Sequence, residues 1–336
     1  MQKHLPPRPR FADRYHAWSI RHGFPILAWL APRLNRRLAR FLARFVIWAI
    51  FVVYPKSKRM LARNYARITG VAERSWRARR GASALLRHFA FYWVDLFRFA
   101  QLPAERAKEL ARAIIGFEHV EHSYAAGKGA IILTAHYGIY ELGSIVLGRG
   151  MPLSVVFVPD KFGDVERFRA IFRNLADVEA IAIEPDASWS SLPVLRALRA
   201  GRLVAMQGDR DFGGPGIPAT FFGERVRFPR GPFLVAMLTG APLVPTFIRY
   251  TAEYEFEASI HAPIEVPSGG AAGNRESHLA AAVQQWATVL ESEIRAHPTQ
   301  WFTFYDYFAE HRVVEEEPRA AAPSAEAVEA GRLASA

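Results

Sequence analysis

Short runs of β-branched and apolar residues alternate with helical stretches from residue 129 onward, and this alternation is the feature that most constrains the fold. Strands are expected at 130–134, 153–158, 180–183, 203–206 and 243–248. Helices are expected at 139–148, 164–176, 188–200 and 231–240, with a last one at 275–296. Strand followed by helix predicts βαβ units, and therefore an α/β fold with a mostly parallel central sheet flanked by helices. The extended stretches 219–228 and 254–262 could add antiparallel edges.

The first quarter of the chain is strongly basic. Residues 1–80 contain 19 Lys/Arg against two acids, Asp13 and Glu73, although the whole chain carries a net charge of only +11. Residues 16–69 are expected to form helices that break near Pro32 and Pro55. This distribution indicates a polyanionic partner surface, either anionic lipid or nucleic acid.

An apolar run in the same region favours lipid. Phe45–Tyr54 is an uncharged segment of ten residues, with Arg40 and Arg44 before it and Lys56, Lys58 and Arg59 after it. A spanning helix needs roughly 20 apolar residues, so this run is too short to cross a bilayer unaided. Bracketed by cations, it predicts interfacial insertion beside anionic headgroups. The alternative is a buried helix whose flanking charges are solvated.

Three regions follow from these patterns. Residues 1–70 are expected to form a basic, apolar helical region that associates with a membrane, and residues 71–310 an α/β domain. Residues 74–101 carry apolar and aromatic side chains at helical spacing and should pack on that domain as a helix. The Ala/Glu/Pro-rich tail, 311–336, is expected to be disordered.

A histidine and a glutamate stand where the first of these strands ends. His136 follows the strand at 130–134, and Glu141 is expected one turn into the next helix, with Gly138 allowing a close turn between them. In open α/β sheets, reactive groups collect beyond the carboxyl ends of strands. A carboxylate that accepts from one imidazole nitrogen fixes the tautomer and leaves the other to take a proton. The alternative is a capping histidine beside a solvated glutamate.

Other catalytic signals are missing from the sequence. There is no cysteine, which excludes thiolate nucleophiles and Cys-bound metals. The chain also lacks the G-x-S-x-G elbow of serine hydrolases, the phosphate-binding G-x-x-x-x-G-K loop and the H-E-x-x-H zinc pair. If the chain is an enzyme, histidine-based acid–base catalysis is what remains.

A second polar cluster follows the strand at 203–206. It contains Asp209, Arg210 and Asp211, a run that is often only a salt-bridged turn. In a binding site, Arg210 would face an anionic group of the substrate while both aspartates hold its guanidinium in place.

Taken in order, five motifs resemble the bacterial lipid A biosynthesis acyltransferase family. That family includes phosphatidylinositol mannoside acyltransferases and belongs to the wider glycerolipid acyltransferase superfamily. The motifs are His136-x4-Glu141, Gly208–Asp211, Phe221–Gly223 with Phe228–Pro232, Thr239–Pro245 and Pro298-x-Gln300-Trp301. The segment Gly208–Asp211 is more similar to the mannoside branch.

This resemblance implies an enzyme on the cytoplasmic face of the bacterial inner membrane. It implies acyl-carrier protein or acyl-CoA as donor and a hydroxyl of a glycolipid as acceptor. No metal or further cofactor is expected, because a thioester donor is already activated. The resemblance also implies His136 and Glu141 as the catalytic pair, with Arg173 needed for activity.

The residues leave other functions open. A thioesterase or lipid hydrolase would use His136 to activate water rather than a lipid hydroxyl. A basic nucleic-acid-binding protein would use residues 1–80 and would lose affinity steeply with salt. A third possibility is a lipid carrier that keeps the fold without catalysis.

Overall fold

The computed structural model describes residues 24–53, 55–99, 111–147, 151–159, 178–183, 191–210, 216–251, 255–268 and 272–313. Arg173, Asp211, the expected helix at 164–176 and the tail beyond residue 313 lie outside these ranges.

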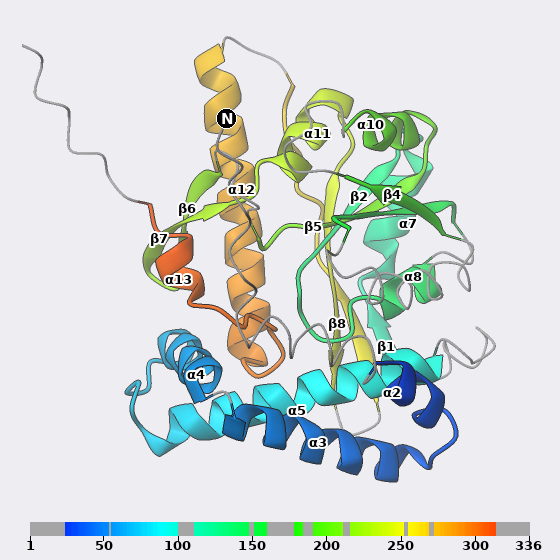
Figure 1. Ribbon diagram of the computed structural model, residues 1–336. Helices are drawn as coiled ribbons and strands as arrows, with labels where there is room; N and C mark the ends of the chain where they lie inside the picture. Colours follow the sequence, from blue (N-terminus) through cyan, green and yellow to red (C-terminus); the bar gives the residue numbers. More distant parts are fainter. Residues whose placement is uncertain are drawn as a thin grey trace, which may run out of the picture.

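A seven-stranded sheet forms the centre of the described chain (Figure 1). The strands are β1 (Ala111–Ile115), β2 (Ala130–Thr134), β3 (Leu153–Phe157), β4 (Glu179–Ala182), β5 (Leu203–Gln207), β8 (Leu243–Tyr250) and β9 (Phe256–Ile260). Their order across the sheet is β1-β9-β8-β2-β5-β3-β4. The strands from β8 to β4 are parallel, while β9 is antiparallel to β8 and β1 is parallel to β9. The mostly parallel α/β fold is therefore confirmed.

Two details of the sheet differ from the sequence prediction. Strand β1 was not anticipated, because a short strand at an edge carries only a weak alternating pattern. The stretch 219–228 was expected as an edge of the sheet, and this is wrong. It contributes to a separate antiparallel hairpin of β6 (Ile217–Phe221) and β7 (Glu224–Phe228). The hairpin turns at Phe222 and Gly223, which both have positive φ, 52° and 80°.

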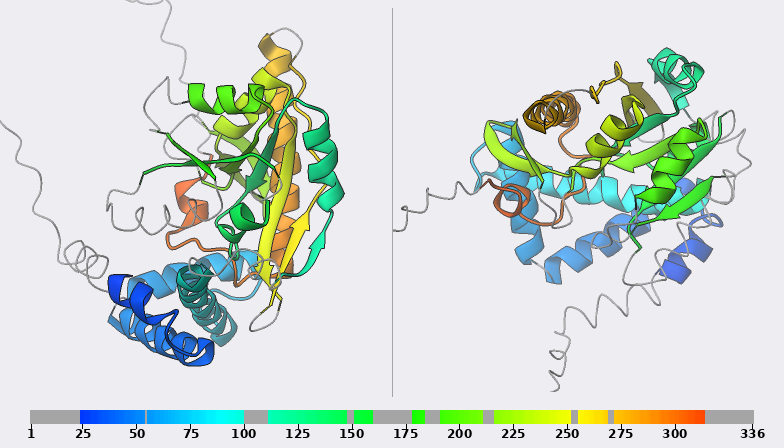
Figure 2. Two further views of the ribbon diagram at one scale, coloured as in Figure 1. Left: turned by 90° about the vertical axis from the view of Figure 1, so that its right-hand side faces the viewer. Right: turned by 90° about the horizontal axis from the view of Figure 1, so that it is seen from above.

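Alternate residues of the central strands enter two different cores. In β2, Ile131 and Leu133 pack with helices α10 (Leu192–Arg199), α11 (Gly231–Thr239) and α12 (Ala272–Ala296) on one face. Ala130 and Ile132 pack with α5 (Trp76–Phe99), α7 (Phe117–Ala125) and α8 (Leu142–Leu147) on the other. Figure 2 shows helices on both sides of the sheet. Because both faces are covered, these strands are apolar throughout instead of alternating with polar residues.

The N-terminal helices break at the two prolines, Pro32 and Pro55, as the sequence predicted. Pro32 lies in the turn between α2 (Phe24–Leu30) and α3 (Arg36–Val53), and Pro55 is the first residue of α4 (Pro55–Thr69). Proline suits a helix start because the first turn needs no donor from its backbone nitrogen. None of the described helices is both long enough and apolar enough to span a membrane.

Helix α5 lies across the lower end of the sheet, with α3 packed beneath it (Figure 1). Asp95 of α5 is fully buried and accepts from Arg36 Nε at 2.9 Å, from Arg40, and from the Tyr250 hydroxyl at 3.2 Å. This cluster ties α3 to α5 and to the end of β8. A domain boundary was expected at residue 70. Helix α4, which precedes it, packs along α5, which follows it. The boundary stays a prediction.

Candidate active site

The strand register brings His136 and Asp209 together. Thr134, the last residue of β2, pairs with Gln207, the last residue of β5, in the parallel ladder. His136 and Asp209 each lie two residues beyond those ends, and the Gly208 N–H donates to the Thr134 carbonyl at 2.8 Å. Both side chains therefore meet at the carboxyl edge of the sheet, where α/β enzymes place reactive groups.

Backbone contacts from both sides hold the loop that carries His136. Gly138 has φ of 60°, and a Cβ there would lie 1.9 Å from the Ile248 carbonyl oxygen of β8, so the close approach requires glycine. The Gly138 N–H donates to the Gln300 carbonyl at 2.9 Å, and the Phe302 N–H donates to the His136 carbonyl at 2.8 Å. The predicted close turn at Gly138 is confirmed.

Asp209 accepts from His136 twice. Its Oδ1 accepts from Nδ1 at 2.9 Å and its Oδ2 from the backbone N–H at 3.1 Å. Trp301 Nε1 donates to the same Oδ2 at 3.1 Å. The Asp209 side chain is fully buried, while that of His136 keeps 15% of its surface exposed. The Asp209 carboxylate is thus surrounded by hydrogen-bond donors, and the His136 imidazole is partly accessible to solvent.

The ionisation of Asp209 fixes the histidine tautomer. Burial by itself raises the pKa of the Asp209 carboxyl, but the attraction and hydrogen bonds of His136 outweigh it, and the Arg210 guanidinium adds to them. The pKa therefore lies well below its ordinary value. An ionised carboxylate only accepts, so Nδ1 carries the hydrogen and Nε2 is the basic nitrogen of the neutral ring.

Glu141 lies in the turn just before α8, because this helix begins at Leu142 and not at the expected residue 139. Its carboxylate accepts from the hydroxyl of Tyr92, a residue of α5. The ring of Tyr140 packs edge-on against His136, with centroids 5.7 Å apart, and its hydroxyl oxygen lies 3.3 Å from that of Tyr92. The carboxylate that the structure places on Nδ1 is that of Asp209, whereas the sequence interpretation gave this position to Glu141.

Arg210 contacts the segment 302–305, which follows Trp301. Its Nη2 donates to the Phe302 carbonyl, and its guanidinium lies 5.7 Å from the centroid of the Tyr305 ring. The sequence interpretation had Asp209 hold this guanidinium, but the hydrogen bonds of Asp209 go to His136 and Trp301. Arg173 and Asp211 lie outside the described residues.

Three contributors to the site were not predicted in these roles: Asp209 as the partner of the imidazole, Trp301 as a donor to it, and Tyr92 as a donor to Glu141. Asp209 had a usable signal, since it follows its strand at the same offset as His136. Trp301 stands in the last of the five family motifs, but the sequence did not indicate its partner. Tyr92 had no signal, because its contact joins segments far apart in the sequence. Within the described ranges no three His, Asp or Glu side chains cluster as metal ligands.

A histidine–carboxylate pair at the carboxyl edge of a parallel sheet is an arrangement that can perform acid–base catalysis. The model of the family described as bacterial lipid A biosynthesis acyltransferase matches residues 7–309. The chain belongs to this family, and it is an acyltransferase.

Curated relatives carry two names. A phosphatidylinositol mannoside acyltransferase of Mycobacterium tuberculosis is 26% identical over 307 residues, covering 88% of this chain and 90% of the relative. One of the same name from Mycolicibacterium smegmatis is 24% identical over 219 residues, covering 65% and 69%. A lipid A biosynthesis acyltransferase of Haemophilus influenzae is 25% identical over 227 residues, covering 64% and 70%.

Proposed function

We propose that this acyltransferase moves a fatty acyl chain from a thioester to a hydroxyl of a glycolipid, with His136 as the general base. The observation that carries the proposal is the hydrogen bond from His136 Nδ1 to the buried Asp209 carboxylate. It supports a fixed tautomer in which Nδ1 carries the hydrogen and Nε2 is the nitrogen that accepts a proton.

The reaction needs no covalent acyl-enzyme. Nε2 removes the proton from the acceptor hydroxyl as its oxygen attacks the thioester carbonyl carbon. The tetrahedral oxyanion then collapses, the C–S bond breaks, and Nε2 returns the proton to the departing thiolate. Asp209 stabilises the imidazolium that exists between these steps. Base catalysis of this kind contributes roughly 10²–10⁴-fold.

The substrates are proposed by analogy with the relatives. Their names point to a phosphatidylinositol mannoside or a lipid A precursor as the type of acceptor. Acyl-carrier protein or acyl-CoA is the proposed donor. Arg210, with Arg173 and Asp211, is proposed to contact the substrates, and the role of Glu141 in catalysis stays a prediction.

The exposed face of α2 and α3 supports contact with a membrane. On α3 the alanines Ala39 and Ala43 face the core, against Ala90 and Val94 of α5. Eight large apolar side chains among the described residues of α2 and α3 instead face solvent, the reverse of the usual amphipathic helix. They are Ile26, Trp29, Leu38, Phe41, Leu42, Phe45, Val46 and Trp48.

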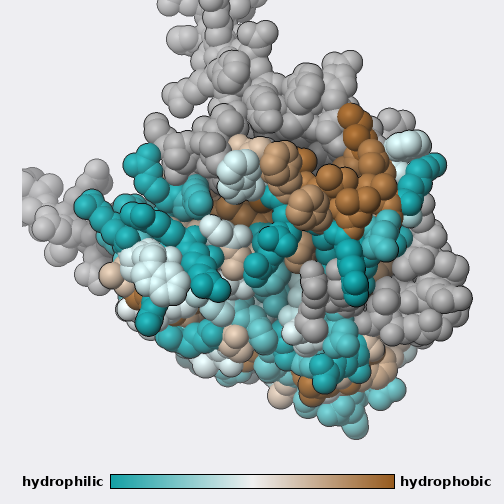
Figure 3. Space-filling model, turned by 90° about the horizontal axis from the view of Figure 1, so that it is seen from below, coloured by the Kyte–Doolittle hydropathy of each residue, from teal (hydrophilic) through white to brown (hydrophobic). Residues whose placement is uncertain are grey.

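Figure 3 shows a hydrophobic patch next to hydrophilic side chains on the lower side of the molecule. Exposed apolar patches of this kind mark sites of interaction. We place α2 and α3 in the headgroup region of the cytoplasmic face of the inner membrane, without spanning it.

Incubation of the purified chain with a radiolabelled acyl thioester and a bacterial lipid extract tests the proposed reaction. The label should move to a lipid, and His136→Ala should abolish the transfer while leaving the melting temperature unchanged. Release of the label as free fatty acid in the presence of acceptor would indicate a thioesterase. Transfer by His136→Ala at the wild-type rate would exclude the mechanism.

A further inference from the structure

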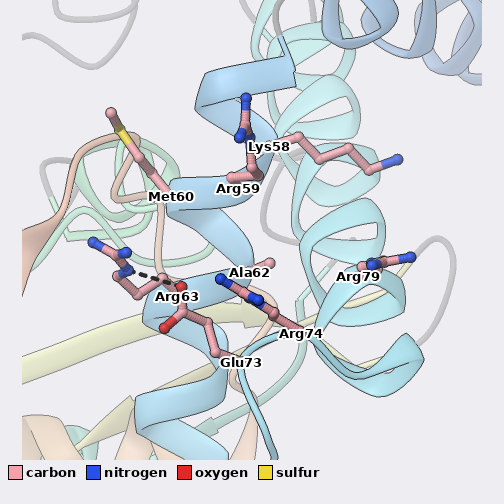
Figure 4. Close-up of a pocket in the computed structure, with 8 residues that line it drawn as sticks. All are labelled: Lys58, Arg59, Met60, Ala62, Arg63, Glu73, Arg74 and Arg79. Carbon is pink, nitrogen blue, oxygen red and sulfur yellow. Dashed lines mark hydrogen bonds and ion pairs between the residues drawn. The ribbon is translucent and has the colours of Figure 1, made fainter.

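A hollow of about 820 Å³ lies along α4 and the start of α5. Its rim is basic, as Figure 4 shows, with a single carboxylate, Glu73. The lining residues with ionised side chains are Lys58, Arg59, Arg63, Glu73, Arg74 and Arg79.

The positive charge in this hollow is not balanced by nearby acids. Glu73 pairs with Arg63 at 3.0 Å, and Arg63 also pairs with Asp306 at 2.8 Å. In the described part of the chain, the other four cations of the hollow make no ion pair. An anionic ligand would therefore gain contacts there without displacing an internal partner.

The lining residues come from two helices and the loop between them. On α4 they run from Lys58 to Arg63, about 7.5 Å of helix at 1.5 Å per residue, and they continue at Glu73 and Arg74 in the loop and at Arg79 of α5. Cations carried by separate elements present a basic surface to a ligand with several negative charges. A bilayer surface is flat and does not enter a hollow, whereas an acidic helix can lie along it.

Helix electrostatics point to the same kind of partner. The first turns of α4 and α5 contain no acidic residue, and Arg79 stands in the first turn of α5. Cations near a helix N-terminus oppose the helix dipole, so an acidic partner would relieve an unfavourable arrangement.

An exposed aromatic residue lies in the sequence between two residues that line the hollow, Arg74 and Arg79. Trp76, at the start of α5, is 63% exposed, and the guanidinium groups of Arg77 and Arg80 lie 6.0 and 5.9 Å from its ring. Tryptophan and arginine are enriched among the residues that dominate protein–protein binding energy. This composition fits a protein partner better than a free nucleotide.

The hollow is linked to the active site by the segment 302–306. Arg63 and Arg67 of α4 both pair with Asp306, and Asn64 Nδ2 donates to the Tyr305 carbonyl at 2.7 Å. In the same segment, the Phe302 N–H donates to the His136 carbonyl. A partner in the hollow would thus bind next to the elements that support the catalytic loop.

We propose that this basic hollow docks an acidic helix of the carrier protein that delivers the acyl thioester. The inference rests on the proposed function, because it assigns a place to the donor of that reaction. It selects a protein-bound thioester over acyl-CoA.

The test compares two donors with the same acyl chain, acyl-carrier protein and acyl-CoA. Arg74→Glu/Arg79→Glu reverses two unpaired charges and leaves Arg63 in place. It should raise KM for the acyl-carrier protein on the order of tenfold, with acyl-CoA unaffected. Arg196→Glu/Arg199→Glu, on the exposed side of α10, makes the same change in net charge and should leave both donors unaffected. Arg74→Lys/Arg79→Lys should retain most of the affinity, because it keeps the charge.

Binding is measured separately from turnover, by fluorescence anisotropy of labelled acyl-carrier protein with the full chain. The affinity should fall with added salt and in Arg74→Glu/Arg79→Glu, whose melting temperature is checked. Equal losses with both donors, equal losses in the α10 variant, or unchanged carrier binding would each overturn the docking site. Loss of vesicle binding in place of carrier binding would assign the hollow to lipid and overturn it too. If the wild type transfers from neither donor, the proposed function fails, and the binding measurement still decides the docking site.

Discussion

At the scale of single residues, the pair His136 and Asp209 depends on a hydrogen bond in which the aspartate only accepts. Asn in place of Asp209 would present an amide N–H to one of its donors, either the imidazole or the Trp301 ring nitrogen. The imidazole would then lose its preferred tautomer and its stabilised cation. Substitution of Asp209 therefore tests the mechanism as directly as substitution of His136.

We expect Asp209→Asn to lower kcat by roughly 10²–10⁴-fold, because a misoriented imidazole is a poor base. Glu141→Gln removes a charge from the other carboxylate and keeps its size, and it serves as the comparison. Steady-state rates with a saturating donor measure both variants. A larger loss in Glu141→Gln than in Asp209→Asn would give the role of orienting carboxylate to Glu141, as the sequence interpretation had it.

Arg210→Lys separates two roles of the guanidinium. If Arg210 binds an anionic group of the acceptor, the variant should raise the acceptor KM by about tenfold, because lysine lacks the planar fork. The donor KM and the melting temperature should change little. If the contact with the Phe302 carbonyl is its whole role, the variant melts earlier and both KM values stay the same.

At the scale of elements, strands and helices in the centre of the chain were predictable, because each carries its own periodic pattern. The strands at 130–134 and 203–207 were located within one residue, and so were the proline breaks in the N-terminal helices. The start of α8 was misplaced, because Gly138 and the bonds to Gln300 and Ile248 keep residues 137–141 out of a helix. Such contacts are made by distant segments and leave no local pattern.

The outward face of α3 gives a prediction at this scale. Phe41→Ser/Phe45→Ser removes two of its large exposed side chains, 63% and 60% exposed, and should weaken binding to anionic vesicles at least about tenfold. High salt should release the wild type only in part, because inserted side chains are not screened.

Leu238→Ser is the matched control for this vesicle assay, since Leu238 is 59% exposed on α11. Cosedimentation measures all three proteins. Equal binding by the α3 variant and the wild type would remove α3 from the membrane contact.

At the scale of the whole molecule, pH should affect stability through His88. This residue of α5 donates Nδ1–H to the Thr299 carbonyl at 3.1 Å. Burial lowers the pKa of His88 from 6.5 to about 4, and the nearby cations Arg87 and Arg40 contribute to the effect. The unfolded chain therefore takes up a proton at a higher pH than the folded chain does.

The free energy of unfolding should consequently fall as the pH drops from about 6.5 towards about 4, by up to about 3 kcal/mol from this group. His88→Gln should flatten the decline in this window. His297, whose pKa burial also lowers, remains in the variant and leaves a smaller slope. Urea titrations at several pH values measure the effect, and an unchanged slope in His88→Gln would show that His88 titrates normally.

The contacts that complete the catalytic loop also set when a newly made chain becomes an enzyme. Trp301 and Phe302 supply the donors to Asp209 and to the His136 carbonyl, yet they are translated long after both. The helices with the exposed apolar face precede all of these residues in the chain. A chain still on the ribosome can thus form that face before residues 300–302 have left the exit tunnel, when His136 and Asp209 still lack the donors that these residues supply. In the order of synthesis, the apolar face comes before the completed catalytic loop.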